Sequence, residues 1–336
     1  AYGQYDAGSQ DIDEFMWNHK DSIILFSAGN NGIDRNSNGI IDTDSIGPEG
    51  CAKNCITVGA TEGNRPHGTT PTPGYDIIWW TGSWKTSFPA DPIKNDHVSD
   101  EPEGMAAFSS RGPTDDGRTK PDVVAPGTNI LSVRSSTVTA APLWGDLPAA
   151  DPLNGLYCWS GGTSMSTPLT AGTVALIRQY LQRVCLQASP SGALQKAILI
   201  HGAVPITGQY TPSEVGAVPD NSQGWGRVNL RNSLFPEYPA TWEFRDIPGD
   251  AVGTGEQRNY TFPVVNTTVP FRVTLAWTDF PSNPAVGGGL VNQLRLSVIA
   301  PNGTVTQGNP ANNNLQQVVI DTPQVGNYTV RVSGIN

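Results

Sequence analysis

The chain has 336 residues, of which 30 are Asp or Glu and 20 are Lys or Arg, so its formal net charge is −10. This excess of acid disfavours nucleic acid as a partner, because phosphate binding requires clustered positive charge, whereas it suits solubility and cation binding. No apolar run approaches the roughly 18 residues of a membrane span, and the length exceeds what one hydrophobic core usually serves. We therefore expect two domains, no nucleic-acid partner and no membrane association.

The first part of the chain predicts alternating helices and strands. Ser9 is a candidate cap for a short helix in which Ile12, Phe15 and Met16 share one face. Residues 23–27 are apolar enough for a fully buried strand, as in a parallel sheet with helices on both faces. Further on, residues 62–106 and 135–156 predict two long surface loops, and residues 190–203 predict another helix.

The residues after the first predicted strand have the spacing of a calcium-binding loop: Asp34, Asn36, Asn38, Gly39, Ile40, Ile41 and Asp42. Calcium takes about six to eight oxygen ligands, and alternate side chains on a tight loop can converge on one point, with the Ile40 carbonyl as a further ligand. Ser45 stands where a helical calcium hand has a bidentate Glu, and Asp44 is the candidate substitute. We expect a structural Ca²⁺; the alternative is an Asn-Gly turn with solvated acids.

Residues 161–168 (GGTSMSTP) indicate a serine nucleophile at the start of a helix. Two glycines allow the backbone to bend tightly and approach a substrate, and Pro168 suits a first helical turn. Residues 169–182 are nearly all apolar and predict a helix buried around most of its circumference. Ser164 would then lie at the positive helix end, which favours negative charge on a carbonyl oxygen under attack. From these residues alone, a Gly-Thr-Ser cap on an ordinary core helix is the alternative.

The pattern changes beyond Phe235, where Pro236 and Pro239 mark a junction. Short alternating segments with turn residues between them then predict strands at 241–245, 257–265, 271–277, 293–299, 316–320 and 328–333. Such even spacing is typical of an antiparallel sandwich or jelly roll. We therefore divide the chain into residues 1–235 and residues 236–336.

Four segments in order resemble the subtilisin-like serine proteases: FSAGN at 26–30, ITVGAT at 56–61, FSSRGPT with KPDVVAPG between 108 and 127, and GTSMSTP at 162–168. The likeness is greatest to bacterial alkaline subtilases that carry a β-rich C-terminal domain. The resemblance implies an α/β fold, part of a subtilisin-like parallel sheet with helices on both faces, followed by an antiparallel β-sandwich of jelly-roll type. It also implies hydrolysis of peptide bonds.

Matched position by position, the resemblance makes Ser164 the nucleophile and Asn30 the side-chain donor of the oxyanion hole. The backbone N–H of Ser164 would be the second donor. One wall of the pocket for the residue before the cut bond would be formed by residues 27–29. The residues expected to contact substrate are thus Ser27, Ala28, Gly29 and Gly162.

The family has its catalytic Asp and His well ahead of the asparagine, and only 29 residues precede Asn30 here. We therefore expect the chain to be truncated, with the Asp and His supplied by an N-terminal segment or a separate chain, and this chain alone to be inactive. His67, in a PHGT segment, follows Asn30 among prolines and is interpreted as a solvated loop residue. His19, His97 and His201 have no motif around them and are interpreted as structural.

The sequence thus predicts a fragment of a secreted, extracellular serine endopeptidase that acts on protein or peptide substrates. One alternative is a non-catalytic calcium-binding scaffold or adhesion module derived from a subtilase. Another is a serine hydrolase, such as an esterase, that uses His67 or His201 as its own base. Cys51 and Cys55 are close enough to form a disulfide, although four free cysteines remain an open alternative.

Overall fold

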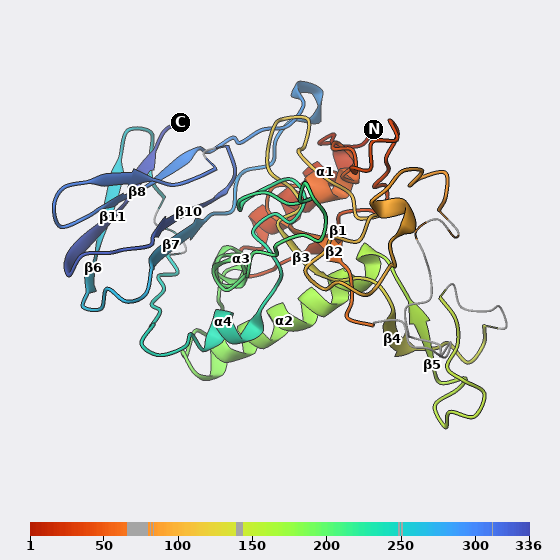
Figure 1. The fold of residues 1–336 in the computed structure, drawn as a ribbon. Coiled ribbons are helices and arrows are strands. Elements are labelled where there is room, and N and C mark those ends of the chain that lie inside the picture. Colours follow the sequence, from red (N-terminus) through yellow and green to blue (C-terminus); the bar gives the residue numbers. More distant parts are fainter. Residues whose placement is uncertain are drawn as a thin grey trace.

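The computed structural model describes residues 1–65, 80, 82, 84–138, 144–247, 249, 251–310 and 312–336. His67 therefore lies outside the described residues. A three-stranded parallel sheet forms the centre of the N-terminal part, in the order β1 (Leu25–Ser27), β2 (Ile56–Thr61), β3 (Val123–Pro126). Figure 1 shows this sheet between the first helix and a long helix, α2.

Helix α1 (Ala7–Asn18) begins two residues earlier than the predicted cap. Asp6 is the N-cap, and its carboxylate accepts a hydrogen bond of 3.0 Å from the backbone N–H of Ser9. Ser9 therefore lies inside the helix and is buried. Ile12 and Met16 pack toward the sheet, as expected, but Phe15 is 46% exposed and lies on another face.

The first strand is shorter and less buried than the sequence predicts. Only Leu25–Ser27 form β1, all three residues are partly exposed, and the strand pairs with β2 alone. The prediction of a fully buried strand at residues 23–27 was wrong because β1 is an edge strand of the described sheet. The central strand β2, in contrast, is buried at all six positions.

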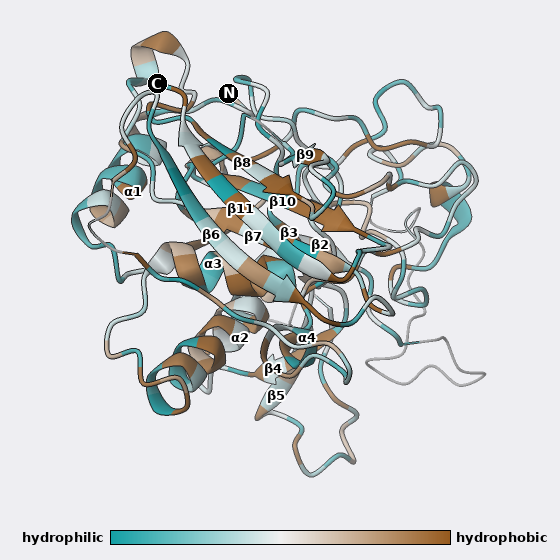
Figure 2. Cartoon of the chain, turned by 90° about the vertical axis from the view of Figure 1, so that its left-hand side faces the viewer, coloured by the Kyte–Doolittle hydropathy of each residue, from teal (hydrophilic) through white to brown (hydrophobic). Residues whose placement is uncertain are grey.

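Helix α2 (Thr163–Arg183) starts before Ser164, so Pro168 lies inside the helix rather than in its first turn. Only one face is buried, and it is formed by Thr163, Ser166, Thr170, Val174, Ile177 and Leu181. Leu169 and Leu176 are 45% and 47% exposed. The prediction of a helix buried all round was therefore wrong. Figure 2 shows apolar and polar residues alternating along α2.

Two more helices complete the N-terminal part, α3 (Gly192–His201) and α4 (Leu230–Leu234). Short 3₁₀ turns, η1 (Pro48–Cys51) and η2 (Ile93–Asn95), lie in the loops. A hairpin of β4 (Ile130–Val133) and β5 (Tyr157–Ser160) leads into α2 and was not predicted. The main core lies between α2, α3 and the parallel sheet, where Val58, Ile177 and Leu199 are fully buried.

The C-terminal strands form two antiparallel sheets. One has the order β6 (Gln257–Val264), β11 (Gly326–Gly334), β8 (Leu294–Ile299), β9 (Val305–Gln307), and the other pairs β7 (Phe271–Ala276) with β10 (Leu315–Ile320). A third 3₁₀ turn, η3 (Pro284–Val286), lies between β7 and β8. Side chains from both sheets, among them Val298, Val318 and Tyr328, share one core. Five predicted strands are present, residues 241–245 form none, and β9 was missed.

The C-terminal strands pack directly against the N-terminal part. The Lys53 ammonium forms an ion pair of 2.6 Å with Asp279, and both side chains are fully buried. Leu315 of β10 belongs to the main core beneath α2 and α3. Figure 1 shows the C-terminal strands, in blue, beside α3. The division at residue 235 remains a prediction.

All four cysteines are free thiols, so the disulfide between Cys51 and Cys55 was a wrong prediction. The two thiols face different backbone carbonyls, those of Gly47 and Ala52 respectively. Among the described residues, no helix combines the length and the apolar character needed to cross a bilayer.

Candidate active site

Ser164 is the second residue of α2 and is exposed to solvent. The preceding Gly162 has a φ of +138°, a conformation that L side chains rarely adopt, so this turn requires glycine. The Gly162 carbonyl accepts a hydrogen bond from the Met165 N–H at 2.9 Å. The N–H of Ser164 belongs to the first turn, where backbone donors have no intrahelical acceptor. It therefore remains a candidate donor for a developing oxyanion.

Asn30 lies three residues after the end of β1, and its side chain contacts the same turn. Its side-chain Oδ1 accepts two hydrogen bonds from Thr163, one from the backbone N–H and one from the hydroxyl, each 2.9 Å long. These contacts fix which end of the carboxamide faces α2. The Nδ2 group, which is the hydrogen-bond donor of the side chain, therefore points away from these contacts. Because Asn30 is exposed, this donor is accessible to a ligand.

The ends of two parallel strands hold this arrangement in place. Gly162 donates its N–H to the Gly127 carbonyl at 2.7 Å, and the Ser166 hydroxyl donates to the Pro126 carbonyl at 3.2 Å. Pro126 is the last residue of β3 and Gly127 follows it, while Asn30 follows β1. Because the carboxyl ends of parallel strands meet at one edge of a sheet, both supports lie beneath the start of α2.

The predicted substrate wall, Ser27, Ala28 and Gly29, continues from β1 to Asn30. Ala28 is fully buried, and its N–H donates to the Val58 carbonyl at 2.9 Å. The Gly29 carbonyl accepts from the Ser110 N–H at 2.9 Å, and the Ser110 hydroxyl accepts from the Asn31 N–H at 3.2 Å. The wall is thus held by β2 and by the segment around Ser110.

None of the described histidines contacts Ser164, whose hydroxyl has no hydrogen-bond partner in this part of the chain. His201 ends α3, and its Nδ1 lies 3.0 Å from the Thr274 hydroxyl of β7. Burial, and then the charge of Arg272, lower the pKa of His201 to about 4. His19 stacks on Phe15, and His97 is buried in another segment. The hydrolase alternative that used His201 as a base is therefore wrong.

The predicted calcium loop is a tight turn held by its own side chains. The Asp34 carboxylate is buried and accepts from the N–H groups of Asn38 and Gly39, both at 2.9 Å. The Asn36 and Asn38 side chains accept from backbone N–H groups two residues further on, and Asp42 accepts from that of residue 35. Gly39 has a φ of +76°, as a sharp turn requires.

The structure also gives the positions of Ile40, Ile41 and Asp44 in and after this loop. Ile41 is buried and anchors the loop, whereas Ile40 is 48% exposed. The Asp44 carboxylate lies beside Gly3, close to the carboxylate of Asp115. Each loop oxygen that accepts one N–H retains a lone pair, but the Asp34, Asp42 and Asp44 carboxylates do not all lie within 4.8 Å of one another, so the described residues do not bring these three predicted ligands together.

Two functional features were missed from the sequence. Thr163 was not singled out, although it orients the Asn30 carboxamide through two contacts across 133 positions of the chain. Ser110 was noted only within a longer segment, yet it fixes Gly29 and Asn31. The role of Thr163 could have been suspected because its hydroxyl immediately precedes the candidate nucleophile. Nothing in the local sequence indicated the role of Ser110.

Comparison with known proteins identifies the family of the chain. The subtilase family model matches residues 1–226, which is more than half of the chain. A serine protease/ABC transporter B family protein, tagB of Dictyostelium discoideum, is 27% identical over 435 aligned residues, covering 100% of this chain and 22% of that protein. The serine protease AprX of Bacillus subtilis is 31% identical over 157 residues, covering 47% of this chain and 26% of that protein. The chain thus spans about a fifth to a quarter of the length of these relatives.

Solved structures give matches of low similarity. Fervidolysin from Fervidobacterium pennivorans, a keratinolytic enzyme related to subtilisin, has a TM-score of 0.39 and 20% identity, with 93% of this chain and 32% of that chain covered. A lanthipeptide protease has a TM-score of 0.40 and 17% identity, with 70% of this chain and 58% of that chain covered. The family match over residues 1–226 carries the assignment by itself: this chain belongs to the subtilase family of serine peptidases.

Proposed function

We propose that this chain carries the nucleophile and oxyanion hole of a subtilisin-like endopeptidase that cleaves peptide bonds through an acyl-enzyme. The Ser164 hydroxyl attacks the peptide carbonyl, and its proton passes to a general base. The new oxyanion accepts hydrogen bonds from the Asn30 carboxamide and the Ser164 N–H. The intermediate then expels the amine, and water hydrolyses the acyl-enzyme. The substrate segment before the cut bond lies along Ser27, Ala28 and Gly29, with Gly162 beside the reacting carbonyl.

One observation supports this proposal most strongly, namely the orientation of Asn30. Its carboxamide oxygen is occupied by the Thr163 N–H and hydroxyl at 2.9 Å each, so its Nδ2 donor is presented next to an exposed serine at a helix N-terminus. A mere helix cap would not need an amide donor fixed in this direction. An oxyanion hole requires one, because its donors must be oriented before charge develops.

We further propose that the general base and its carboxylate come from polypeptide outside these 336 residues, in the same protein or in a second chain. Ser164 has no imidazole partner among the described residues. In the described residues β1 pairs only with β2, and Leu169 and Leu176 are exposed on α2, the helix that begins with Thr163 and Ser164. Parallel sheets normally have their edges and faces covered, so these surfaces suit an additional strand and helix.

A structural Ca²⁺ is proposed for the loop that follows the oxyanion asparagine. Its ligands would be Asp34, Asn36, Asn38, the Ile40 carbonyl, Asp42 and Asp44. The ion would rigidify the loop after Asn30 and take no part in the chemistry. The Asx turns of this loop favour such a role, because they hold the side-chain oxygens on a curved backbone.

We propose a secreted, extracellular protein that acts on protein or peptide substrates, without nucleic-acid or membrane partners. The acidic net charge of −10 supports the first of these exclusions. We also propose that the C-terminal strands form a β-sandwich module of jelly-roll type, for which their shared core is the support.

A second candidate function is a non-catalytic, calcium-binding scaffold or adhesion module derived from a subtilase. It is favoured by one observation, the lack of a base beside Ser164 in the described residues. Reconstitution separates the two functions. The chain is mixed or fused with the polypeptide that precedes it in its gene, and cleavage of casein and of a chromogenic peptide is measured. The endopeptidase predicts activity that is lost in Ser164→Ala. A folded, stable complex with no activity on either substrate supports the scaffold.

A further inference from the structure

Three carboxyl groups, none of them a candidate catalytic residue, converge beyond the carboxyl end of β2. Glu62 directly follows β2 and is fully buried, while Asp96 and Asp100 lie on the segment that follows η2. One carboxylate oxygen of each residue lies within 4.8 Å of the others. Like charges at this distance in a buried position repel each other strongly, so the three groups cannot all be ionised without a cost.

The hydrogen-bond donors around this cluster are neutral. Tyr210 donates its hydroxyl to Asp96 at 2.6 Å, and the Gln209 amide donates to Asp96 at 2.9 Å and to Glu62 at 3.3 Å. Glu62 also accepts from the Trp80 indole N–H and from the backbone N–H of residue 100, both at 3.3 Å. No Lys or Arg in the described part of the chain forms an ion pair with any of the three carboxyls.

The charged groups that face the cluster offset its charge only in part. His97 lies beside Asp96, and its charge favours the ionised form of that carboxyl, but burial opposes ionisation more strongly. Glu214 faces Tyr210 from the 207–214 segment and adds negative charge. Arg111, on the other side of Tyr210, donates to the Ser109 carbonyl at 2.7 Å rather than to a carboxylate. A bound proton is therefore the simplest compensation for the buried charge.

Burial, followed by the charges of Asp96 and Asp100, raises the pKa of Glu62 well above its usual range. For Asp96, burial raises the pKa to about 6, although the Tyr210 hydroxyl opposes this shift. Both groups therefore bind a proton more tightly in the folded protein than in an opened segment.

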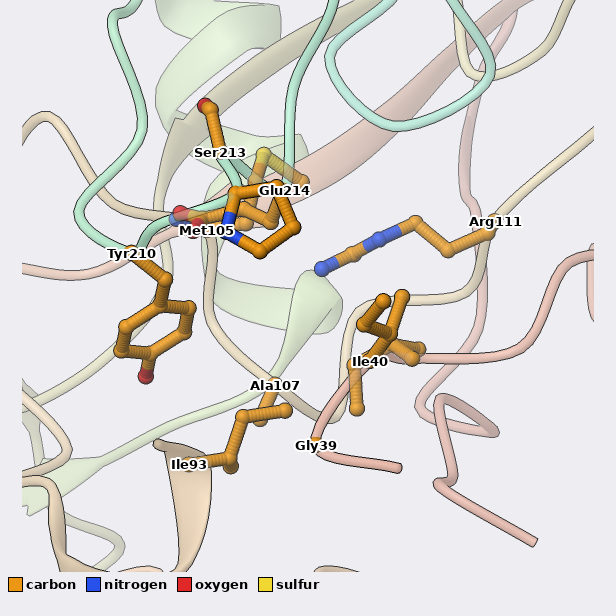
Figure 3. A pocket seen from close by; sticks show the side chains of 11 residues that line it. Gly39, Ile40, Ile93, Met105, Ala107, Arg111, Tyr210, Ser213 and Glu214 are labelled. Atoms are coloured by element: carbon orange, nitrogen blue, oxygen red, sulfur yellow. The ribbon is translucent and has the colours of Figure 1, made fainter. Parts of the chain in front are cut away.

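The cluster joins two segments that are distant in sequence. Besides Gln209 and Tyr210, the 207–214 segment contributes Glu214, whose carboxylate accepts from the Met105 N–H at 2.9 Å. Figure 3 shows Tyr210, Met105, Arg111 and Glu214 around a pocket. Its volume of about 20 Å³ is enough for roughly one water molecule. From Met105 the chain continues to Ser110, which holds the substrate wall.

We propose that the Glu62, Asp96 and Asp100 carboxyls form a proton-dependent clamp, which holds residues 94–105 against residues 207–214 and releases them at alkaline pH. The direction of this pH dependence follows from the raised pKa values of Glu62 and Asp96. Protonation stabilises the closed clamp fully below the ordinary carboxyl pKa, and this stabilisation is lost as the pH rises through the folded values, which begin at about 6 for Asp96. The clamp adjoins the segment that supports the substrate wall, so its release would loosen that wall.

Hydrogen–deuterium exchange of peptides from both segments tests the clamp. After correction for the intrinsic pH dependence of exchange, the opening equilibrium should increase at least about tenfold between pH 5 and pH 8.5, the change that Asp96 alone supplies when its pKa moves from 3.8 to about 6. Glu62→Gln keeps an acceptor for Trp80 but removes a charge, so at pH 8.5 its exchange should be at least about tenfold slower than that of the wild type. Glu14→Gln, at an exposed carboxyl of α1, is the control and should match the wild type.

Tyr210→Phe provides a second readout that does not depend on overall stability. Loss of the hydroxyl removes a contact that lowers the pKa of Asp96, so the pH midpoint of release should move upward. Equal protection at pH 5 and pH 8.5 in the wild type overturns the proposal, and so does a pH dependence that persists unchanged in Glu62→Gln. Full protection restored at pH 8.5 by Ca²⁺, in both the wild type and Asp34→Asn, would also overturn it, because a metal cation would then be the ligand.

Discussion

Thr163, Asn30 and Ser164 show how one short turn can bring the Asn30 amide group close to the first backbone N–H groups of a helix. Ser164 and Asn30 were predicted because each lies in a distinctive local motif. The role of Thr163 could not be predicted, because its contacts with Asn30 depend on how β1 and α2 meet in space. The cap of α1 was predicted wrongly as Ser9, because Asp6, three residues earlier, also has a side chain that can cap a helix and takes that role.

The Asn30 and Thr163 pair leads to a prediction for the reconstituted enzyme. Asn30→Ala should lower kcat by about 10² to 10³, the range taken from the corresponding donor of subtilisin itself. Thr163→Val loses one of the two hydrogen bonds that orient Asn30 and should lower kcat by roughly tenfold. The double variant should be no worse than Asn30→Ala, because Thr163 acts through Asn30.

Steady-state kinetics on a chromogenic peptide measure these effects. Thr173→Val is the control, since its hydroxyl likewise makes one hydrogen bond, to the Leu169 carbonyl of α2 at 3.0 Å, but lies away from the turn. Additive losses in the double variant would show that Thr163 acts independently of Asn30.

At the scale of elements, α2 and β1 differ most from what the sequence predicts. Their apolar residues indicate full burial, but β1 is an edge strand and α2 is buried on one face only. Periodicity reports which residues can be buried, not whether a neighbour is present to bury them. The β4 and β5 hairpin was missed because 23 residues separate the end of one strand from the start of the next.

The exposed face of α2 predicts self-association of this chain on its own. Replacing Leu169 and Leu176 by Gln should reduce dimers or aggregates, while the melting temperature changes little because both side chains are about half exposed. Light scattering coupled to size-exclusion chromatography measures the association. Val265→Thr, at an 83% exposed position of the C-terminal part, is the control and should have no effect. A monomeric wild type at high concentration would contradict this prediction.

For the whole molecule, the contact between the two parts depends on buried charge. Lys53 bonds Asp279 at 2.6 Å, and Asp279 also accepts from the N–H groups of Val291 and Asn292. The two-part organisation stays a prediction from the change of pattern near residue 235. The ion pair could not, because 226 positions separate its members and neither belongs to a motif.

Asp279→Ala should therefore destabilise the protein by about 3–5 kcal/mol, because it leaves the Lys53 ammonium buried without a counter-ion. Chemical denaturation followed by circular dichroism measures the loss. Glu237→Ala removes a surface ion pair with Arg231, in which both side chains are 73% exposed, and should change stability by less than about 1 kcal/mol. Equal effects of the two substitutions would show that the buried pair does not hold the parts together.

Reaction with a fluorophosphonate tests the central claim most directly. This chain alone, folded and monomeric or self-associated, should be labelled slowly and incompletely, because Ser164 has no base among the described residues. Addition of the polypeptide that supplies the base should give rapid, stoichiometric labelling, detected by intact mass and absent in Ser164→Ala. Rapid stoichiometric labelling of this chain by itself would contradict the account.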